Sequence, residues 1–358
     1  MKKEKIFFTP GPTELYPEVR KYIEEALDSN ICSLNHRSSE FMEIFRHTAD
    51  MLKKLMNIPD NYKVFFLSSA TECMDRIVQN CVESQSFHFV NGAFAERFYR
   101  TALELNKNAS KADADFGKSF DFGNISIDNS PELICITQNE TSTGVAIDTG
   151  EIYKIKKSYP DSIIAADIVT SAPFVEIDFD RLDCAFFSVQ KGFGLPAGLG
   201  VLLLNQKCID KAEQLKKNNI SIGSYHNFLS LNENAVKYQT TETPNVLAIY
   251  LLGRVCKSLS DYGIQRIRKE TEDKAKVLYD FFDNHEFLKP FVSDKKDRSK
   301  TIINVEAGNR QNEIRKKLAD NGIIAGSGYG KYKESQIRLA NFPMHKPEDV
   351  MRITEILK

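Results

Sequence analysis

The part of the sequence that decides the fold is Cys184-Ala-Phe-Phe-Ser-Val-Gln-Lys-Gly-Phe-Gly194. Its first six residues are apolar or small, which is typical of a strand buried on both faces of a sheet. Lys191 follows, and then a glycine-rich loop in which backbone can approach a ligand closely. Because desolvation lowers the pKa of a lysine from about 10.4 toward neutrality, a lysine at the end of a buried strand can become a nucleophilic amine. The stretch therefore predicts a central strand with a reactive group at its end.

Similar apolar runs lie on both sides of this stretch, and each predicts a buried strand. They cover residues 64–67, 87–90, 133–137, 163–167 and 201–204. Between the first two runs, apolar residues from Met74 to Val82 recur at helical spacing, so that a strand, a turn and a helix follow one another. This alternation predicts an α/β fold in which a mainly parallel sheet lies between helices.

The pattern changes after about Pro244, where long helical stretches replace the short apolar runs. We expect helices over 246–259, 264–282 and 312–320 and from Pro347 onward, and strands over 301–305 and 336–340. The polar run 293–298 predicts a solvated hairpin or loop tip. These elements indicate a large domain over residues 15–245 and a smaller α+β domain formed by residues 246–358 together with residues 1–14.

The segment 106–124 differs from the rest of the large domain because it is polar and rich in Gly, Asp, Lys and Ser. We interpret it as an irregular surface excursion and as a candidate rim loop over the site.

Composition narrows the function classes. The 358 residues carry 48 Lys and Arg against 49 Asp and Glu, a formal net charge of −1 that provides no large field to attract nucleic acid or an anionic membrane. The longest apolar stretch, 197–204, is too short to span a bilayer, and residues 1–8 lack the apolar core of a signal peptide. Seven scattered cysteines without a CxxC pair indicate reduced thiols in a cytosol, with Cys81, Cys135 and Cys184 as small core residues. We therefore expect a cytoplasmic protein whose specificity resides in pockets.

The ends of the predicted strands carry the residues that chemistry would need. Open α/β sheets bind ligands at the carboxyl ends of their strands. In this sequence those ends are Ser68-Ser-Ala-Thr71, Asn91-Gly-Ala-Phe94, Asn139-Glu-Thr141, Asp167 and Gln190-Lys191. A carbonyl cofactor could form a Schiff base with Lys191. Pyridoxal phosphate would also need a carboxylate at its ring nitrogen, a helix N-terminus for its phosphate and an aromatic face for its ring. Asp167, Ser69-Ala70-Thr71 and Phe94 fit these three demands.

With these residues in view, the chain resembles the class V aminotransferases, which are pyridoxal-phosphate enzymes of fold type I. The matching segments, in the order of the family, are Thr9-Pro-Gly-Pro12, His36-Arg-Ser-Ser-Glu-Phe41, Asn139-Glu-Thr-Ser-Thr-Gly144, Ala166-Asp167, Ser188-Val-Gln-Lys191, Pro196-Ala-Gly-Leu199, Thr243-Pro244 and Arg338. The resemblance implies a homodimer whose large domain holds the cofactor on a seven-stranded mixed sheet.

The resemblance also implies roles for single residues. Lys191 would be the Schiff-base lysine, and Asp167 would pair with the ring nitrogen of the cofactor. Phe94 would stack on the ring, and Thr141 would donate a hydrogen bond near its phenolic oxygen. The phosphate would contact Gln190 from the same chain and Thr243 from the neighbouring subunit.

For the substrate, the resemblance points to two arginines. Arg338 matches the position that binds the α-carboxylate of the amino acid, for which a bidentate guanidinium is the natural partner. His36 and Arg37 resemble the pair that meets the distal anion in phosphoserine aminotransferases. These enzymes usually carry a His-Arg pair before the carboxylate arginine, but here residues 326–335 contain Lys331 and Lys333, which are candidate substitutes.

Several functions remain open at this point. The first is a transaminase that acts on a small amino acid and a 2-oxo acid, with phosphoserine/3-phosphohydroxypyruvate and glutamate/2-oxoglutarate as its substrates. An alanine- or serine-glyoxylate type of aminotransferase is the alternative. A lyase or cysteine desulfurase would need a cysteine on a mobile C-terminal loop, but the last cysteine, Cys256, falls in a predicted helix. A non-catalytic descendant is disfavoured by the intact Lys191, Asp167 and Arg338.

Overall fold

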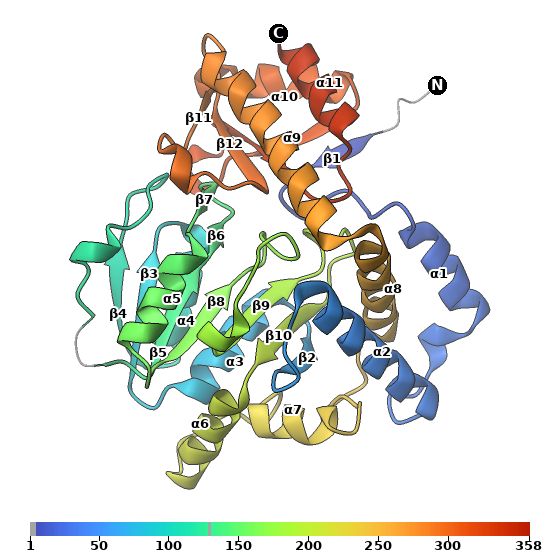
Figure 1. Ribbon diagram of the computed structural model, residues 1–358, viewed down its shortest axis with the longest axis vertical. Coiled ribbons are helices and arrows are strands. Elements are labelled where there is room, and N and C mark those ends of the chain that lie inside the picture. Colours follow the sequence, from blue (N-terminus) through green and yellow to red (C-terminus); the bar gives the residue numbers. More distant parts are fainter. Residues whose placement is uncertain (1–4, 128–129) are drawn as a thin grey trace.

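The large sheet forms the centre of the molecule in the computed structural model, which describes residues 5–127 and 130–358 (Figure 1). Within these residues it has seven strands in the order β2-β10-β9-β8-β5-β3-β4. Their bounds are β2 Lys63–Leu67, β3 Gln85–Val90, β4 Asn108–Asp113, β5 Leu133–Thr137, β8 Ile163–Asp167, β9 Cys184–Ser188 and β10 Gly200–Leu204. Neighbouring strands are parallel except that β10 runs antiparallel to β2 and β9. The predicted α/β fold with a mainly parallel sheet is confirmed.

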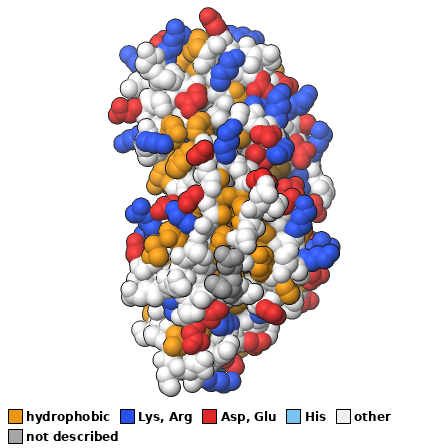
Figure 2. All heavy atoms as spheres, turned by 90° about the vertical axis from the view of Figure 1, so that its left-hand side faces the viewer, with side chains coloured by type: hydrophobic (Ala, Val, Ile, Leu, Met, Phe, Trp, Pro, Cys, Tyr) orange, Lys and Arg blue, Asp and Glu red, His pale blue; other side chains and the backbone are white. Residues whose placement is uncertain are grey.

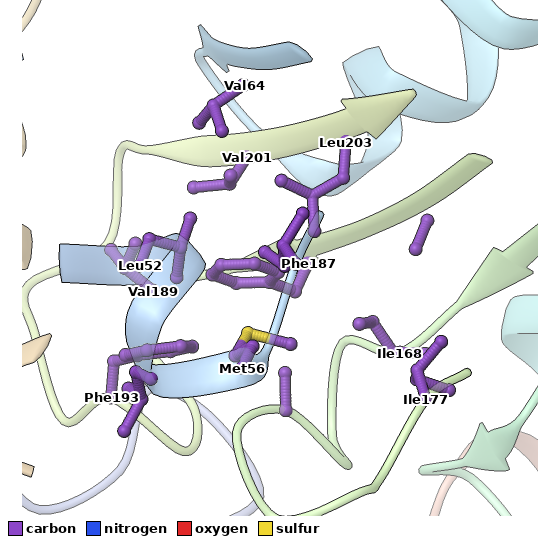
Figure 3. Close-up of a cluster of buried hydrophobic side chains, with 14 of the residues drawn as sticks. Leu52, Met56, Val64, Ile168, Ile177, Phe187, Val189, Phe193, Val201 and Leu203 are labelled. Carbon is purple, nitrogen blue, oxygen red and sulfur yellow. The ribbon is translucent and has the colours of Figure 1, made fainter. Parts of the chain in front are cut away.

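Helices cover both faces of the large sheet because successive side chains of a strand point to opposite faces. On one face, Phe65, Cys135 and Phe186 belong to a buried cluster with helices α3, α4, α6 and α7, whose bounds are Ala70–Cys81, Ala93–Glu104, Gln206–Lys217 and Phe228–Ala235. On the other face, the sheet packs against α2 (Ser39–Met56), α5 (Thr149–Ser158) and α8 (Val246–Tyr262). Figure 3 shows this second cluster, in which Leu52 and Met56 of α2 lie beside Phe187 and Val201 of the sheet.

A small sheet lies at the end of the molecule that is uppermost in Figure 1, near the C-terminus. Its order is β1-β13-β14-β12-β11, with bounds β1 Ile6–Phe8, β11 Lys289–Pro290, β12 Ile302–Glu306, β13 Ile323–Ser327 and β14 Gln336–Ala340. Helices α9 (Ile264–Asn284), α10 (Gln311–Asp320) and α11 (Pro347–Leu357) share one buried cluster with it. The remaining elements are helix α1 (Val19–Asp28) and the short antiparallel pair β6 (Asn139–Glu140) and β7 (Val145–Ala146).

The predicted boundary between the domains falls at the start of α8. The apolar side chains of α8, and Ile267 of α9, belong to the cluster of the large sheet, so the chain passes from one core to the other along α9. The division at residues 245 and 246 stays a prediction. Residues 1–4, which we assigned to the smaller domain and to the stretch without a signal-peptide core, lie outside the described residues.

Two predictions about surface segments are wrong in part. Within 106–124, residues Asn108–Asp113 form the edge strand β4, because pairing with β3 needs main-chain groups rather than apolar side chains. Farther along the segment, Phe120 and Phe122 pack on Phe89, with ring centroids 5.2 and 5.4 Å apart. The polar run 293–298 is exposed over residues 293–296, as predicted, but its last residue is not. Arg298 is buried and pairs with Asp283 at 2.8 Å, because the ion pair and a main-chain acceptor satisfy its guanidinium.

The charge distribution on the surface and the burial of the cysteines agree with what the composition predicts. Figure 2 shows Lys and Arg intermixed with Asp and Glu over one side of the molecule. Cys81, Cys135 and Cys184 are buried among apolar side chains, as predicted. None of the helices in the described ranges has both the length and the apolarity needed to cross a membrane.

Candidate active site

Lys191 lies in a buried pocket at the carboxyl ends of the strands. It follows β9 and is 9% exposed, and its Nζ donates a hydrogen bond to the carbonyl oxygen of Pro10 at 2.6 Å. Gly11 has a φ of +136°, and a Cβ at this position would lie 2.4 Å from the lysine side chain. Thr9-Pro-Gly-Pro12, far away in the sequence, therefore forms one wall of the pocket and requires glycine there.

The environment of Lys191 favours the neutral amine. Burial lowers the pKa of Lys191 to about 8, and the positive charge of Arg338 acts in the same direction. The carboxylates of Asp167 and Glu140 oppose this shift. A large fraction of the molecules therefore carries a free, nucleophilic amine at mildly alkaline pH.

Asp167 is the last residue of β8 and is 2% exposed. Its Oδ1 accepts a hydrogen bond from the backbone N–H of Val169 at 2.8 Å. Burial raises the pKa of Asp167 to about 7, and Glu140 adds to the effect whereas Lys191 opposes it. A cation placed against this carboxyl would favour its ionised form, so Asp167 is suited to pair with a protonated ring nitrogen.

Glu140 is a residue to which the sequence analysis assigned no role. Its fully buried carboxylate accepts hydrogen bonds from the backbone N–H groups of Phe94 (3.1 Å), Ala95 (2.9 Å) and Ser142 (2.9 Å). Burial raises the pKa of Glu140, and these hydrogen bonds oppose the rise. Gly92 is required beside it, because a Cβ there would lie 2.3 Å from Cγ of Glu140. Glu140 thus fixes the N-terminus of α4, where a negative charge is stabilised by the helix dipole. Its place in Asn139-Glu-Thr141, after a buried strand, was the available signal.

Phe94 and Arg338 both lie next to Tyr329, a second residue that the sequence analysis did not single out. The rings of Phe94 and Tyr329 have centroids 5.4 Å apart, and Cζ of Arg338 lies 5.5 Å from the ring centroid of Tyr329. Arg338 donates hydrogen bonds to the carbonyl oxygens of Ser327 (2.7 Å) and Thr141 (3.3 Å). Burial lowers its pKa to about 10, so it stays charged at neutral pH. Among the described residues Arg338 has no ion pair, which leaves its charge available to an anionic substrate.

Thr141 is held inside this pocket by its neighbours. Its side chain is buried, and its hydroxyl donates to Oγ1 of Thr170 at 3.1 Å. Thr170 also accepts a hydrogen bond from Asn139 at 2.8 Å. The hydroxyl of Thr141 is thus oriented by a polar network. We use the name inner pocket for Lys191, Asp167, Glu140, Thr141, Phe94 and Arg338.

Ser69, Ala70 and Thr71 lie at the N-terminus of α3, with Ser69 as the N-cap. The hydroxyl of Ser69 accepts from the N–H of Glu72 at 3.1 Å, and the N–H of Ala70 donates to Ser188 of β9 at 2.9 Å. Thr71 is exposed at this end of the helix. Oε1 of Gln190 is buried and has no hydrogen-bond partner within the described ranges. The N–H groups of the helix terminus fit the phosphate of a cofactor. Gln190 could contact a phosphate only through its Nε2 donor, because its unsatisfied Oε1 is an acceptor.

His36, Arg37 and Thr243 form a separate group, which we call the outer cluster. Nδ1 of His36 lies 3.3 Å from Oγ1 of Thr243, and both Arg37 and Thr243 are exposed. Arg37 donates to the amide oxygens of Asn234 (2.9 Å) and Gln239 (2.6 Å), which do not neutralise its charge. Burial and the neighbouring Arg37 lower the pKa of His36. In the part of the chain that the structure describes, no hydrogen bond or ion pair joins the outer cluster to the inner pocket.

The two lysines proposed as substitutes for the His-Arg pair are exposed. Nζ of Lys331 lies 5.5 Å from the ring centroid of Phe116 and 5.1 Å from that of Tyr332. The segment around Phe116, interpreted above as a rim loop, thus contacts the loop that follows Tyr329. A phosphate-binding role for Lys331 or Lys333 stays a prediction.

Comparisons with known proteins agree with this geometry. The family model described as Aminotransferase class-V matches residues 6–332. The phosphoserine aminotransferases of Rhodococcus opacus (strain B4) and Rhodococcus jostii (strain RHA1) are each 26% identical over 355 residues, which is 97% of this chain and 93% of each relative. The crystal structure of a phosphoserine aminotransferase, SerC, from Cytophaga hutchinsonii is 44% identical, has a TM-score of 0.97, and is matched over 99% of this chain and 98% of that one.

A more distant structure shares the fold. The alanine–glyoxylate aminotransferase from Nostoc sp. has a TM-score of 0.80 at 18% identity, and is matched over 100% of this chain and 96% of that one. The family match covers most of the chain and includes the strands whose ends carry Lys191 and Asp167. The chain therefore belongs to the class V aminotransferase family, and it is a transaminase.

Proposed function

We propose that this transaminase uses pyridoxal phosphate to exchange the amino group between phosphoserine and 3-phosphohydroxypyruvate on one side and glutamate and 2-oxoglutarate on the other. This reaction would place it in serine biosynthesis in the cytoplasm. The main support for phosphoserine as the substrate is the 44% identity to the phosphoserine aminotransferase SerC along nearly the whole chain. Arg338 and Arg37, neither of which has an acidic partner among the described residues, support an amino acid with two separate anionic ends.

The inner pocket would hold the ring of the cofactor, and the N-terminus of α3 would hold its phosphate. The bound cofactor supplies an aldehyde for attachment to Lys191 and an electron-poor ring that stabilises negative charge on the α-carbon. Phe94 would cover the ring, and the hydroxyl of Thr141 would turn from Thr170 to donate to its phenolic oxygen. Asp167 would keep the ring nitrogen protonated, while Gln190, Ser69, Ala70 and Thr71 would bind on the phosphate side.

Lys191 would also carry the proton. With the cofactor bound, the free amine of Lys191 would act as a general base that takes a proton from the α-carbon of the substrate and would deliver it to C4′. The low pKa of Lys191 supports this role, because a base must be unprotonated to accept. Arg338 would orient the substrate by its α-carboxylate.

A homodimer with shared sites is part of the proposal. Thr243 is exposed next to His36, so its hydroxyl is open to a second subunit, whose cofactor phosphate it would contact. Because His36 and Arg37 belong to the same outer cluster, they would face that second site together with Thr243. Light scattering on active protein checks this, since a fully active monomer would contradict a shared site.

Substrate specificity is tested by following the cofactor absorbance while single amino acids convert the bound cofactor to its amine form. We expect phosphoserine and glutamate to react much faster than alanine, serine or aspartate. A preference for alanine or serine with glyoxylate as acceptor would instead support the alternative, which rests on the shared fold and on motifs common to these families. Cys256 is buried in α8 and burial raises its pKa, which disfavours a desulfurase.

A further inference from the structure

His226 lies between two carboxylates beside the α3 terminus. Its Nδ1 is 2.5 Å from Oε1 of Glu72, and its Nε2 is 2.6 Å from Oε2 of Glu242. The side chain of His226 is 2% exposed, against 18% for Glu72 and 29% for Glu242. We call these three residues the His226 clamp. Since both ring nitrogens face carboxylate oxygens, the geometry suits an imidazolium that donates on both sides.

The clamp joins two segments that the proposed function assigns to cofactor phosphates. The N-terminus of α3 would bind the phosphate of its own chain, and the Thr243 segment would contact the phosphate of the second subunit. Glu72 is in the first turn of α3, where its Oε2 also accepts from the N–H (2.8 Å) and the hydroxyl (2.6 Å) of Ser68. Glu242 directly precedes Thr243 and accepts a hydrogen bond from the hydroxyl of Thr241. His226 therefore fixes the turn that begins α3 to the segment that carries Thr243.

The charges of the clamp explain why a cation is needed there. A carboxylate in the first turn of α3 repels a phosphate at the same terminus, although it suits the helix dipole. Burial alone would lower the pKa of His226, but the hydrogen bonds to Glu242 and Glu72 outweigh burial and raise it to about 9. Burial would raise the pKa of Glu72, yet hydrogen bonds from His226 and Ser68 lower it to about 2.

The other charged and titratable groups around His226 do not replace it. The ring of Tyr225 stacks on the imidazole with centroids 3.9 Å apart. Arg76 donates to the carbonyl oxygen of Tyr225 at 3.0 Å and forms an ion pair with Asp75, so its charge is already matched. The two carboxylates of the clamp thus depend on the imidazolium.

We propose that His226 is a positioning residue for the cofactor phosphates. It neutralises Glu72 beside the α3 terminus, which would bind the phosphate of its own chain, and it holds in place the segment whose Thr243 would contact the phosphate of the second subunit. The proposal rests on the function proposed above, because it assumes that pyridoxal phosphate is the cofactor. It assigns His226 no contact with the reacting atoms. Loss of the imidazolium should therefore weaken retention of the cofactor more than it slows the loaded enzyme.

The test measures the dissociation constant of pyridoxal phosphate, by absorbance titration of cofactor-free protein, for the wild type and His226→Gln. We expect the variant to bind pyridoxal phosphate about tenfold or more weakly at pH 7.5, since charged hydrogen bonds are lost on both sides of the ring. Binding of pyridoxal, which lacks the phosphate, should change by no more than about twofold if the clamp acts on the phosphate. The matched control is His285→Gln, in which a histidine at the end of α9 that bonds Leu357 is replaced.

A second variant separates charge from folding. In Glu72→Gln/His226→Gln the repelling carboxylate is gone, and the amide oxygen of Gln can still accept from Ser68. This double variant should recover most of the affinity for pyridoxal phosphate, which a purely structural role of His226 would not explain.

The pH dependence of pyridoxal phosphate binding gives a third measurement. The imidazolium is present below about pH 9 and is lost above it, so the affinity ratio between wild type and His226→Gln should fall toward one as the pH rises through 9.

The outcomes distinguish the two proposals. If wild-type protein binds no pyridoxal phosphate, the proposed function fails. If it binds the cofactor but His226→Gln has the same affinity and the same pH profile, only the role of His226 is overturned. An equal loss of affinity for pyridoxal and pyridoxal phosphate would also overturn it, because the effect would not depend on the phosphate.

Discussion

The inner pocket and the outer cluster are two polar regions of one chain that differ in how far the chain completes them. In the inner pocket, Lys191, Asp167 and Glu140 are buried and bonded to groups of the same chain. In the outer cluster, Arg37 and Thr243 are exposed, and the contacts of Arg37 are to neutral amides. The inner pocket is therefore preorganised within one chain. In the outer cluster, the guanidinium of Arg37 and the hydroxyl of Thr243 are exposed and can contact a ligand or a second subunit.

This difference indicates how the two regions contribute. Buried and fully bonded groups sit in a low effective dielectric, where their pKa values shift and charge stabilisation is strong. An exposed arginine is screened by water and contributes mainly when a ligand or a second subunit excludes that water. Substitutions in the inner pocket should therefore affect every substrate, and substitutions in the outer cluster should discriminate between substrates.

The largest effect should come from Lys191→Ala, which removes the attachment point of the cofactor and the proposed proton carrier together. We expect turnover to fall by about 10³-fold or more, because a general base alone is worth roughly 10²–10⁴. Mass spectrometry after borohydride reduction should find the cofactor attached to the wild type and absent from the variant. Full activity of Lys191→Ala would show that the amino-group transfer does not depend on the inner pocket.

Asp167→Asn should have the next largest effect, because a neutral amide cannot hold the ring nitrogen in its protonated form. We expect kcat to fall by about 10²-fold, with a smaller loss for Asp167→Glu, which keeps the charge. Steady-state rates with the preferred amino acid provide the measurement. Normal turnover of the Asn variant would mean that another residue pairs with that nitrogen.

The pair Arg338→Ala and Arg37→Ala compares the two regions directly. Arg338→Ala should reduce kcat/KM for every amino acid by roughly 10- to 100-fold, since a charged hydrogen bond is worth about 1.5–3 kcal/mol. Arg37→Ala should have a smaller and selective effect, weakening phosphoserine and glutamate and sparing alanine.

To compare the two variants, kcat/KM of each is measured for phosphoserine, glutamate, alanine, serine and aspartate. A uniform loss in Arg37→Ala would place Arg37 in the same functional class as Arg338. If the wild type prefers alanine or serine and Arg37→Ala leaves these rates unchanged, the phosphoserine proposal gives way to the glyoxylate type.

Much of the fold was predictable because short apolar runs predict strands that are covered on both faces, and this holds even for β2, which lies at one edge of the sheet. The runs 64–67, 133–137 and 163–167 match β2, β5 and β8 to within one residue. The edge strand β4 was missed, since an edge strand is stabilised by main-chain pairing with β3 and needs no apolar pattern. Arg298 was misassigned because its partner Asp283 lies 15 residues earlier in the chain, where the sequence gives no sign of contact.

By itself, the sequence determined which residues stand at the ends of the strands, because hydrophobic periodicity locates a strand and therefore the residue that follows it. Lys191, Asp167 and Thr141 could be brought together by that argument and by the family motifs. Only the tertiary structure showed Glu140 bonded to the start of α4, Tyr329 next to both Phe94 and Arg338, and His226 between Glu72 and Glu242. His226 and Glu72 are 154 residues apart. The physical reason is that burial and hydrogen bonding set the charge of a group, and both depend on neighbours that only the folded chain provides.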